Sequence, residues 1–263
     1  LFALFCKGAK ITLLRGNHEF QKVCSVYGFQ QELFETFQSN LLFTSFVEAF
    51  NYLPLVGLVD EQLFCVHGGI SQGLITLNRL DDLNNIPRPL SLSKPRAVHD
   101  LMWSDPSTTY PNFVESERGN SSTYGKQSVK KFLEKYNLKM IIRGHQSCTE
   151  GYKAAFDRTC VTVFSASSYS YDGSNKASVL MVNNTYDAIP RLQRQGAQFF
   201  SMNRRQSQSK IRCKTLGVSY AKQGQAILRS SPSRYSTGKS RIHHSSTISA
   251  IPSFGGIEFH IET

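Results

Sequence analysis

The sequence predicts an α/β fold in which short buried strands alternate with amphipathic helices. Three apolar runs, over residues 11–14, 63–66 and 138–142, have the length and composition of buried strands. Each run leads directly into a glycine turn that carries polar side chains. Since binding sites in α/β proteins form where strands end, this pattern favours an enzyme with its site at the strand ends.

The first half of the chain contains two predicted helices and a hairpin. Phe29, Leu33 and Phe37 recur at helical spacing, so we expect an amphipathic helix there, and a second helix over residues 45–52. Residues 55–59 and 62–66 are predicted strands on either side of the tight Asp60-Glu61 turn, which is typical of a hairpin.

The alternation continues in the second half. Val129, Phe132 and Tyr136 predict a helix that leads into the strand over residues 138–142. Two further strands are expected over residues 160–164 and 177–182. The elements therefore fit one domain with a substantial core, which we place over residues 1–195.

The remaining residues, 196–263, differ in composition from this domain. They are dense in Ser, Arg, Lys, Gln and Thr, their apolar residues show no lasting period, and we expect a disordered tail. The chain has a net charge of +11, of which residues 201–263 carry +8. Because the basic charge belongs to the tail, we do not expect a nucleic-acid-binding face on the domain.

Composition also bears on the location of the protein. No apolar run reaches the roughly 18 residues that a membrane span needs, so no membrane partner is expected. The six cysteines form no CxxC pair, and several lie in predicted strands, where a reduced thiol packs as a small apolar group. Reduced cysteines favour a cytoplasmic or nuclear protein over a secreted one.

The polar residues at the strand ends suit a metal and a phosphate. Asn17 follows the first strand, His67 the second and His145 the third. Imidazole nitrogens and amide or carboxylate oxygens are ligands that Mn, Fe or Zn accept. The strand ends therefore suit a site that binds a metal and a phosphate.

Seven segments together resemble one family, the phosphoprotein phosphatases, which are metal-dependent serine/threonine phosphatases that include type 1, type 2A and calcineurin. They occur in family order and at family spacing within residues 1–192. The resemblance implies a calcineurin-like metallophosphoesterase β-sandwich flanked by helices. The segments are LLRGNHE (13–19), HGGIS (67–71), LMWSDP (101–106), ERGNSSTYG (117–125), IIRGHQ (141–146), EGYK (150–153) and FSASSY (164–169).

The resemblance implies hydrolysis of phosphoserine and phosphothreonine by water that two metal ions activate, each Mn, Fe or Zn, and it implies ligands for one of the two. Asn17, His67 and His145 match these ligands. A lone histidine at a strand end is more often a hydrogen-bonded structural residue, so the assignment depends on the three occurring together. Trp103 and Asp105 match a segment close to the active site and are given supporting roles, although Trp103 alone would indicate core packing.

The resemblance also implies residues that act on the substrate. His18 matches the general acid that protonates the departing serine or threonine oxygen. Arg118 matches an arginine that grips the phosphate, a task that suits a planar guanidinium, although such an arginine in isolation is usually a surface charge. Tyr169 matches a tyrosine that lines the site. Phosphoprotein substrates and regulatory subunits are the partners that the family implies.

Two family motifs, GDxHG and GDxxDRG, do not occur in the 263 residues. In the family they supply the other metal site, the carboxylate that bridges both metals and a second phosphate-binding arginine. We therefore expect an N-terminally truncated catalytic domain that lacks its first strands, keeps at most part of one metal site, and is inactive as it stands. The alternative is a pseudophosphatase that acts as a protein-binding module.

Overall fold

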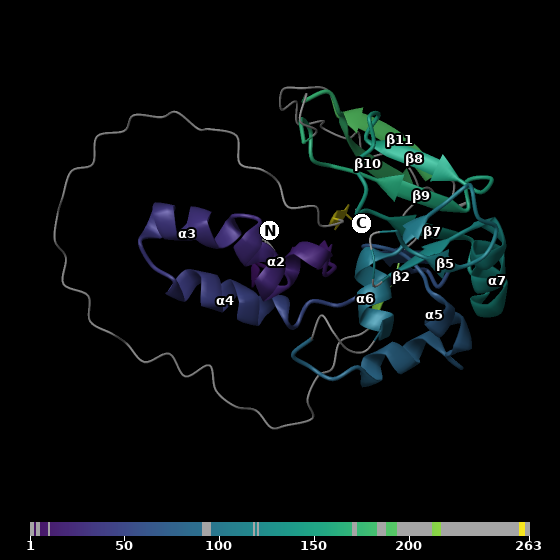
Figure 1. Cartoon of the computed structure of the whole chain (residues 1–263), viewed down its shortest axis with the longest axis horizontal. Coiled ribbons are helices and arrows are strands. Elements are labelled where there is room, and N and C mark those ends of the chain that lie inside the picture. Colours follow the sequence, from purple (N-terminus) through teal and green to yellow (C-terminus); the bar gives the residue numbers. More distant parts are fainter. Residues whose placement is uncertain are drawn as a thin grey trace.

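The structure of the chain is a computed structural model, shown in Figure 1. It describes residues 3, 6–9, 11–90, 96–117, 119, 121–169, 173–182, 188–193, 212–216 and 258–260. Within this part of the chain, helices and strands are mixed along the sequence. The predicted α/β class is confirmed.

A six-stranded mixed sheet forms the centre of the molecule, in the order β12-β2-β3-β7-β9-β8. The strands β3, β7 and β9 run parallel to one another, whereas β12-β2, β2-β3 and β9-β8 are antiparallel pairs. The predicted hairpin is therefore confirmed as β2-β3. The bounds are β2 (Val56–Val59), β3 (Leu63–Val66), β7 (Met140–Arg143), β8 (Tyr152–Ala155), β9 (Cys160–Val163) and β12 (Cys213–Leu216).

Side chains of the central strands alternate between two cores, as the two-residue period of a strand requires. In β3, Phe64 and Val66 belong to the larger core, and Leu63 and Cys65 to a smaller one on the other face. Three helices, α5, α6 and α7, contribute buried side chains to the larger core. Their bounds are α5 (Gln72–Thr76), α6 (Arg96–Trp103) and α7 (Lys126–Tyr136).

The smaller core is closed by a hairpin and by the first strand. Leu180 and Val182 of β10 (Ala177–Val182) pack against it, and β10 pairs with β11 (Ala188–Gln193). Leu14, the residue after β1 (Ile11–Leu13), is buried in the same cluster. The central sheet is thus covered by helices on one face and by strands on the other.

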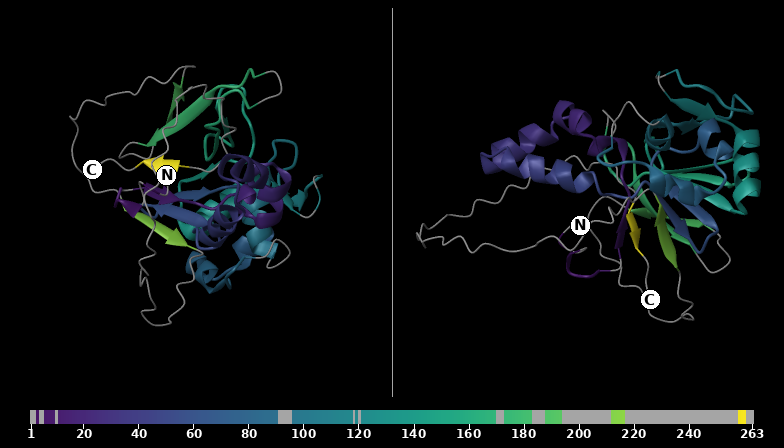
Figure 2. Two further views of the ribbon diagram at one scale, coloured as in Figure 1. Left: turned by 90° about the vertical axis from the view of Figure 1, so that its left-hand side faces the viewer. Right: turned by 90° about the horizontal axis from the view of Figure 1, so that it is seen from below.

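Three helices form an arm that projects to one side of the sheet (Figures 1 and 2). They are α2 (Gln21–Val26), α3 (Phe29–Phe37) and α4 (Leu41–Phe50). The ring centroids of Phe29 and Phe46 lie 5.4 Å apart, in an edge-on contact that joins α3 to α4. Both predicted helices are confirmed, but the second begins earlier than residue 45.

The remaining elements of the fold are short. They are the 3-10 helices η1 (Asn17–Glu19) and η2 (Leu80–Asn85) and a small sheet of β4 (Asp105–Pro106), β5 (Val114–Glu115) and β6 (Ser122–Tyr124). Among the residues that the structure describes, no helix is both long and apolar enough to cross a membrane.

The prediction of a disordered tail does not hold for residues 213–216. They form β12, an edge strand that pairs antiparallel with β2, and Leu216 is fully buried in the larger core. The backbone N–H of Asp60 donates to the carbonyl of Arg212 at 2.7 Å, and Lys214 forms an ion pair with Asp81 at 2.6 Å. The main-chain bonds come from β2, which the local sequence of the tail does not reveal.

A second short strand from the tail, β13 (Glu258–His260), pairs antiparallel with β1. The strand β1 is thus joined to the tail and not to the central sheet. Most of the tail lies outside the described residues. The domain boundary at residue 195 and the absence of first strands stay predictions.

We predict that Leu216→Ala lowers the free energy of unfolding by about 2–5 kcal/mol, since it removes a fully buried side chain and leaves a cavity. Urea unfolding followed by circular dichroism measures this change. Lys214→Ala is the control, because its ion pair is half-exposed and should contribute at most about 1 kcal/mol. Equal, small effects of both substitutions would show that β12 does not dock on the sheet.

Candidate metal centre

Two neighbouring parallel strands bring His67 and His145 together. In the register of β3 and β7, Val66 lies opposite Arg143, and the N–H of Gly144 donates to the carbonyl of His67 at 3.0 Å. The chain after each strand therefore leaves the sheet at the same edge. The two imidazole rings meet edge-on, with centroids 5.4 Å apart.

Asn17 reaches this pair from a different part of the fold. The N–H of Arg15 donates to the carbonyl of Pro54 at 2.8 Å, which positions the turn before η1 beside the start of β2. Oδ1 of Asn17 then lies 2.8 Å from Nε2 of His67, and both side chains are buried. Two of the three predicted ligands are thus in direct contact, and the ring of the third, His145, lies against that of His67.

Gly16 allows this approach because it has no side chain. A Cβ at this position would lie 2.9 Å from Nδ1 of His67 and 2.8 Å from Oε2 of Glu19. The N–H of Gly16 donates to that Glu19 oxygen at 2.7 Å. A side chain at this position would therefore require Glu19 or His67 to shift.

His145 is oriented by Asp105. The Nδ1–H of His145 donates to Oδ1 of Asp105 at 2.8 Å, and this contact is largely shielded from solvent. A carboxylate that accepts from one ring nitrogen fixes the tautomer and leaves Nε2 of His145 with a lone pair. His145 has a φ of 65°, a left-handed conformation that is uncommon for a residue with a side chain.

Arg143 joins the loops around the centre. Its fully buried guanidinium donates from Nε to the carbonyl of Gly68 at 2.6 Å and from Nη2 to Asp105 at 2.7 Å and the carbonyl of Ser104 at 3.1 Å. A third nitrogen, Nη1, donates to Gln146 at 3.0 Å. One side chain therefore holds the turns after β3, α6 and β7 together.

Asn17, His67 and His145 suit a single metal ion in donor type, and the spacing of the first two also agrees with one. Two ligands at about 2.1 Å from one metal lie roughly 3 Å apart, close to the 2.8 Å between Oδ1 of Asn17 and Nε2 of His67. Burial lowers the pKa of His67 well below its ordinary value, so this imidazole is neutral, as a ligand must be. No cluster of three His, Cys, Asp or Glu side chains suited to a metal occurs in the described ranges.

His18 lies beside the candidate ligands. Its ring centroid is 5.0 Å from that of Tyr27, and its pKa is lowered by burial and by the nearby charge of His145. His18 is therefore close enough to the centre to be affected by it electrostatically. Its role as a general acid stays a prediction.

The other predicted site residues have different outcomes. Tyr169 is 56% exposed, and its ring packs edge-on against Phe164 with centroids 5.2 Å apart. The structure places it after β9 and does not bring it into a described contact with the ligand group. Arg118 lies outside the described residues. Trp103 contacts His145 edge-on at 5.6 Å and stacks on His99 at 5.9 Å, so it borders the centre as well as the core.

Arg143 is the residue that sequence reasoning missed. It lies within the segment IIRGHQ and at the polar end of the apolar run over residues 138–142, but it was given no role. A charged residue at the end of a strand buried on both faces is rarely left without partners, and this was the available signal. Its partners come from segments 38 and 75 residues away, which sequence spacing does not show.

We predict that the protein loses stability in mild acid because of His67. Burial, with the charges of His145 and Arg143, holds the pKa of His67 well below 6.5 in the folded state. Below about pH 6.5 the unfolded chain binds a proton at His67 and the folded chain does not. The free energy of unfolding therefore decreases as the pH is lowered, by up to about 1.4 kcal/mol per pH unit. Urea unfolding between about pH 7.5 and 5 should show a shallower dependence for His67→Gln. An unchanged slope would contradict this prediction.

Comparison with known proteins gives a consistent family. The family model of calcineurin-like phosphoesterases matches residues 1–148, which is more than half of the chain. The matched region contains Asn17, His67 and His145.

Two curated relatives are protein phosphatases. The chain is 38% identical over 193 residues to a protein phosphatase 2A catalytic subunit of Dictyostelium discoideum, covering 70% of this chain and 60% of the relative. It is 39% identical over 175 residues to the serine/threonine-protein phosphatase 4 catalytic subunit of Saccharomyces cerevisiae, covering 66% and 56%. The chain thus spans about 60% of the length of the curated relatives that it matches.

A solved structure shares the fold. It is a protein serine/threonine phosphatase from Saccharomyces cerevisiae with similarity to human phosphatase PP5. It matches with a TM-score of 0.64 and 27% identity, over 71% of this chain and 61% of the solved chain.

Proposed function

The chain belongs to the calcineurin-like phosphoesterase family, and from this we propose that it supplies part of the catalytic centre of a protein serine/threonine phosphatase. Two of the curated relatives are named as catalytic subunits of protein phosphatases, which supports phosphoester hydrolysis as the reaction class. The contact of Asn17 with His67, beside the ring of His145, is the observation that carries the proposal.

In this proposal, Asn17, His67 and His145 hold one divalent or trivalent metal ion, either Mn, Fe or Zn. When bound, such a metal lowers the pKa of water and polarises a phosphoryl oxygen. Asp105 and Arg143 orient the His145 imidazole for this task, since they fix its Nδ1–H and thereby its ring plane.

We further propose that His18 donates the proton to the departing serine or threonine oxygen. Its lowered pKa keeps the ring neutral in the free protein, and a bound phosphate dianion would raise that pKa and allow the ring to carry the proton. Arg118 binds the phosphate through paired N–H groups, and Tyr169 lines the substrate side.

The complete reaction is proposed to need a second metal and its carboxylates. Within the part of the chain that the structure describes, no His, Cys, Asp and Glu cluster provides such a site. We therefore propose that the 263 residues bind metal without turnover, and that a polypeptide that also carries GDxHG and GDxxDRG hydrolyses phosphoproteins. Regulatory subunits and a cytoplasmic or nuclear location belong to the same proposal.

The test compares the 263-residue chain with the longest product of its gene, using a phosphothreonine peptide and Mn²⁺. We expect turnover only in a product that carries both motifs, and a loss of about 10²–10⁴-fold in kcat for His18→Asn in that product. An inactive product with both motifs, or one unaffected by His18→Asn, would contradict the proposal. A gene that encodes neither motif would favour the binding-module alternative.

A further inference from the structure

The strand β12 forms the outer edge of the central sheet, beside β2 (Figure 2). It comes from the polar tail and lies beyond the residues that the family model matches. In the antiparallel register, Cys213 lies opposite Val59 and Leu216 lies opposite Val56. If β12 left the sheet, β2 would present N–H and C=O groups without a strand partner, and such an edge accepts another extended chain.

The side chains of β12 show which sequence this edge accepts. Leu216 is fully buried in the larger core. Lys214 lies two residues earlier, on the same face of the strand, and pairs with Asp81 of η2 at 2.6 Å. Cys213 lies on the opposite face and packs against the smaller core. The edge therefore has a position for a lysine and, two residues later, a buried position for a leucine.

Hydrogen bonds fix both ends of the segment that is seated on β2. At its start, the N–H of Arg212 donates to Oδ1 of Asp60 at 2.6 Å, and the N–H of Asp60 donates to the carbonyl of Arg212 at 2.7 Å. At its end, the N–H of Leu55 donates to the carbonyl of Leu216 at 3.0 Å. The contacts at this edge therefore extend over residues 212–216 of the present occupant.

We propose that this edge of β2 is a docking site for an extended segment of a partner protein in which a leucine follows a lysine by two residues, and that residues 212–216 occupy the site in cis. The occupant is assigned from the segment that is seated there. Its backbone pairs with β2, its leucine fills a buried position, and its lysine meets Asp81. A partner segment with the same pattern adds to the sheet by the same contacts.

The tail strand competes with the partner segment for the edge. Of the four residues of β12, only Leu216 is fully buried, and the ion pair of Lys214 is half-exposed. Short elements with few buried side chains open locally more readily than the core. Because the tail is covalently attached, its effective concentration at the edge is on the order of millimolar. A partner segment therefore binds more tightly when the tail strand is weakened.

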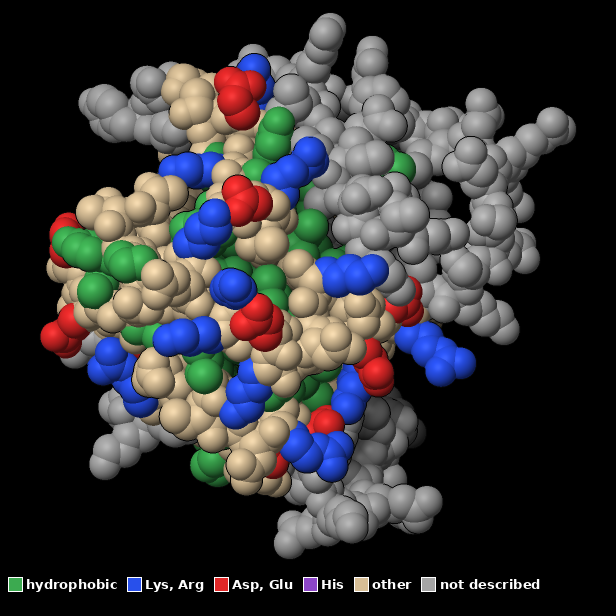
Figure 3. Space-filling model, turned by 90° about the vertical axis from the view of Figure 1, so that its right-hand side faces the viewer, with side chains coloured by type: hydrophobic (Ala, Val, Ile, Leu, Met, Phe, Trp, Pro, Cys, Tyr) green, Lys and Arg blue, Asp and Glu red, His purple; other side chains and the backbone are tan. Residues whose placement is uncertain are grey.

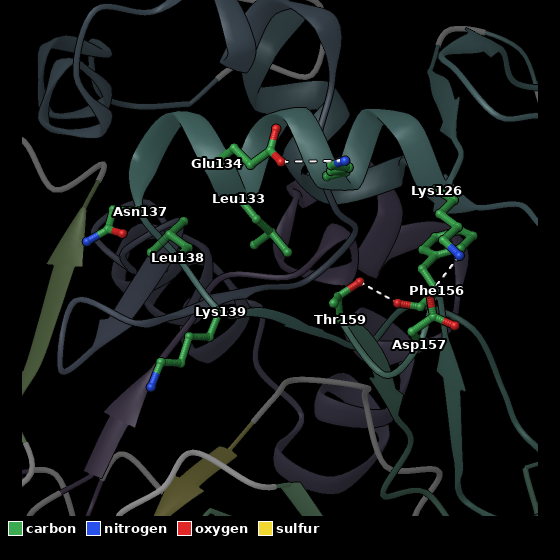
Figure 4. Close-up of a pocket in the computed structure, with 10 residues that line it drawn as sticks. Lys126, Leu133, Glu134, Asn137, Leu138, Lys139, Phe156, Asp157 and Thr159 are labelled. Carbon is green, nitrogen blue, oxygen red and sulfur yellow. Dashed lines mark hydrogen bonds and ion pairs between the residues drawn. The ribbon is translucent and has the colours of Figure 1, made fainter.

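A second surface, the groove between α7 and the turn from β8 to β9, does not indicate an occupant (Figure 4). Its carboxylates already pair with its lysines, Asp157 with Lys126 at 2.6 Å and Glu134 with Lys130 at 3.8 Å. On the face that carries α7, basic and acidic side chains are interspersed (Figure 3). The edge of β2 differs because a segment of known sequence is seated on it.

The test is fluorescence anisotropy of a labelled peptide with the sequence of residues 210–218, KIRCKTLGV, titrated under reducing conditions with the whole 263-residue chain. Leu216→Ala in the chain should tighten peptide binding by about tenfold or more, because it weakens the strand that competes in cis. Lys214→Glu leaves no cavity but places a carboxylate beside Asp81, and should tighten binding roughly threefold. Leu133→Ala is the matched control, since it shortens a leucine of the same core in α7 and leaves β12 intact.

A second peptide, in which alanine replaces the leucine, should bind about tenfold more weakly or worse to every form of the chain. Tighter binding in Leu216→Ala and Lys214→Glu, together with this loss, supports the docking site. Binding that is no tighter in either variant, or as tight with the alanine peptide, would overturn the proposal. Equal tightening in Leu133→Ala would overturn it as well, because destabilisation alone would then expose an adhesive surface. The assay requires no turnover, so its outcome is separate from that of the proposed function.

Discussion

Replacing Arg143 with alanine should lower the free energy of unfolding by about 3–5 kcal/mol, because it leaves a buried carboxylate without its cation. The guanidinium is fully buried and bonds to Gly68 after β3, to Ser104 and Asp105 after α6, and to Gln146 after β7, so three loops lose a shared partner together. Urea unfolding monitored by fluorescence of Trp103, the single tryptophan, measures the change near the centre itself.

The control for this substitution is Arg79→Ala. Arg79 also pairs with an aspartate, Asp81 at 3.2 Å, but its side chain is 75% exposed. Exposed pairs of this kind contribute about 1 kcal/mol or less. A loss of stability in Arg143→Ala no larger than in Arg79→Ala would show that Arg143 does not hold the loops together.

Gly68→Ala should be the second large effect, with a loss of about 3 kcal/mol and a displaced metal centre. An added Cβ would lie 2.6 Å from the carbonyl carbon of Met102 and 2.7 Å from the N of Trp103. These are backbone atoms at the end of α6, so relief of the clash requires a backbone shift of either this helix end or the turn at Gly68. Thermal unfolding and metal affinity together measure the result.

Gly73→Ala is a control for which we expect a change in stability of the opposite sign. Gly73 lies within α5, and the nearest atom to an added Cβ is the hydroxyl of Ser71 at 3.6 Å, an ordinary contact. Alanine favours a helix over glycine by up to about 1 kcal/mol, so a small gain is expected. If both substitutions destabilise equally, close packing at Gly68 is not the cause.

Much of the fold could be predicted because it depends on local periodicity. The β2-β3 hairpin and the helices α3 and α7 have apolar residues at the spacing that their own conformation requires. The strand β12 could not be found in this way. Its pairing is supplied by the exposed edge of β2, and its residues stand in a stretch rich in polar side chains.

Only part of the candidate metal centre could be predicted from the sequence. Parallel strands end at one edge of a sheet, so a shared location for His67 and His145 followed from the strand pattern. The contacts of Arg143, including its hydrogen bond to Asp105, depend on how α6 packs over the sheet, and no local sequence pattern specifies that packing. The exposure of Tyr169 likewise depends on the loop after β9.

Isothermal titration of Mn²⁺ into the 263-residue chain tests most directly whether Asn17, His67 and His145 form a metal centre. We predict one ion per chain, lost in His67→Ala and in Asn17→Ala, and retained in His99→Ala, a half-buried histidine on α6 that is not among the ligands. Binding that survives His67→Ala, or that falls equally in His99→Ala, would contradict this metal centre.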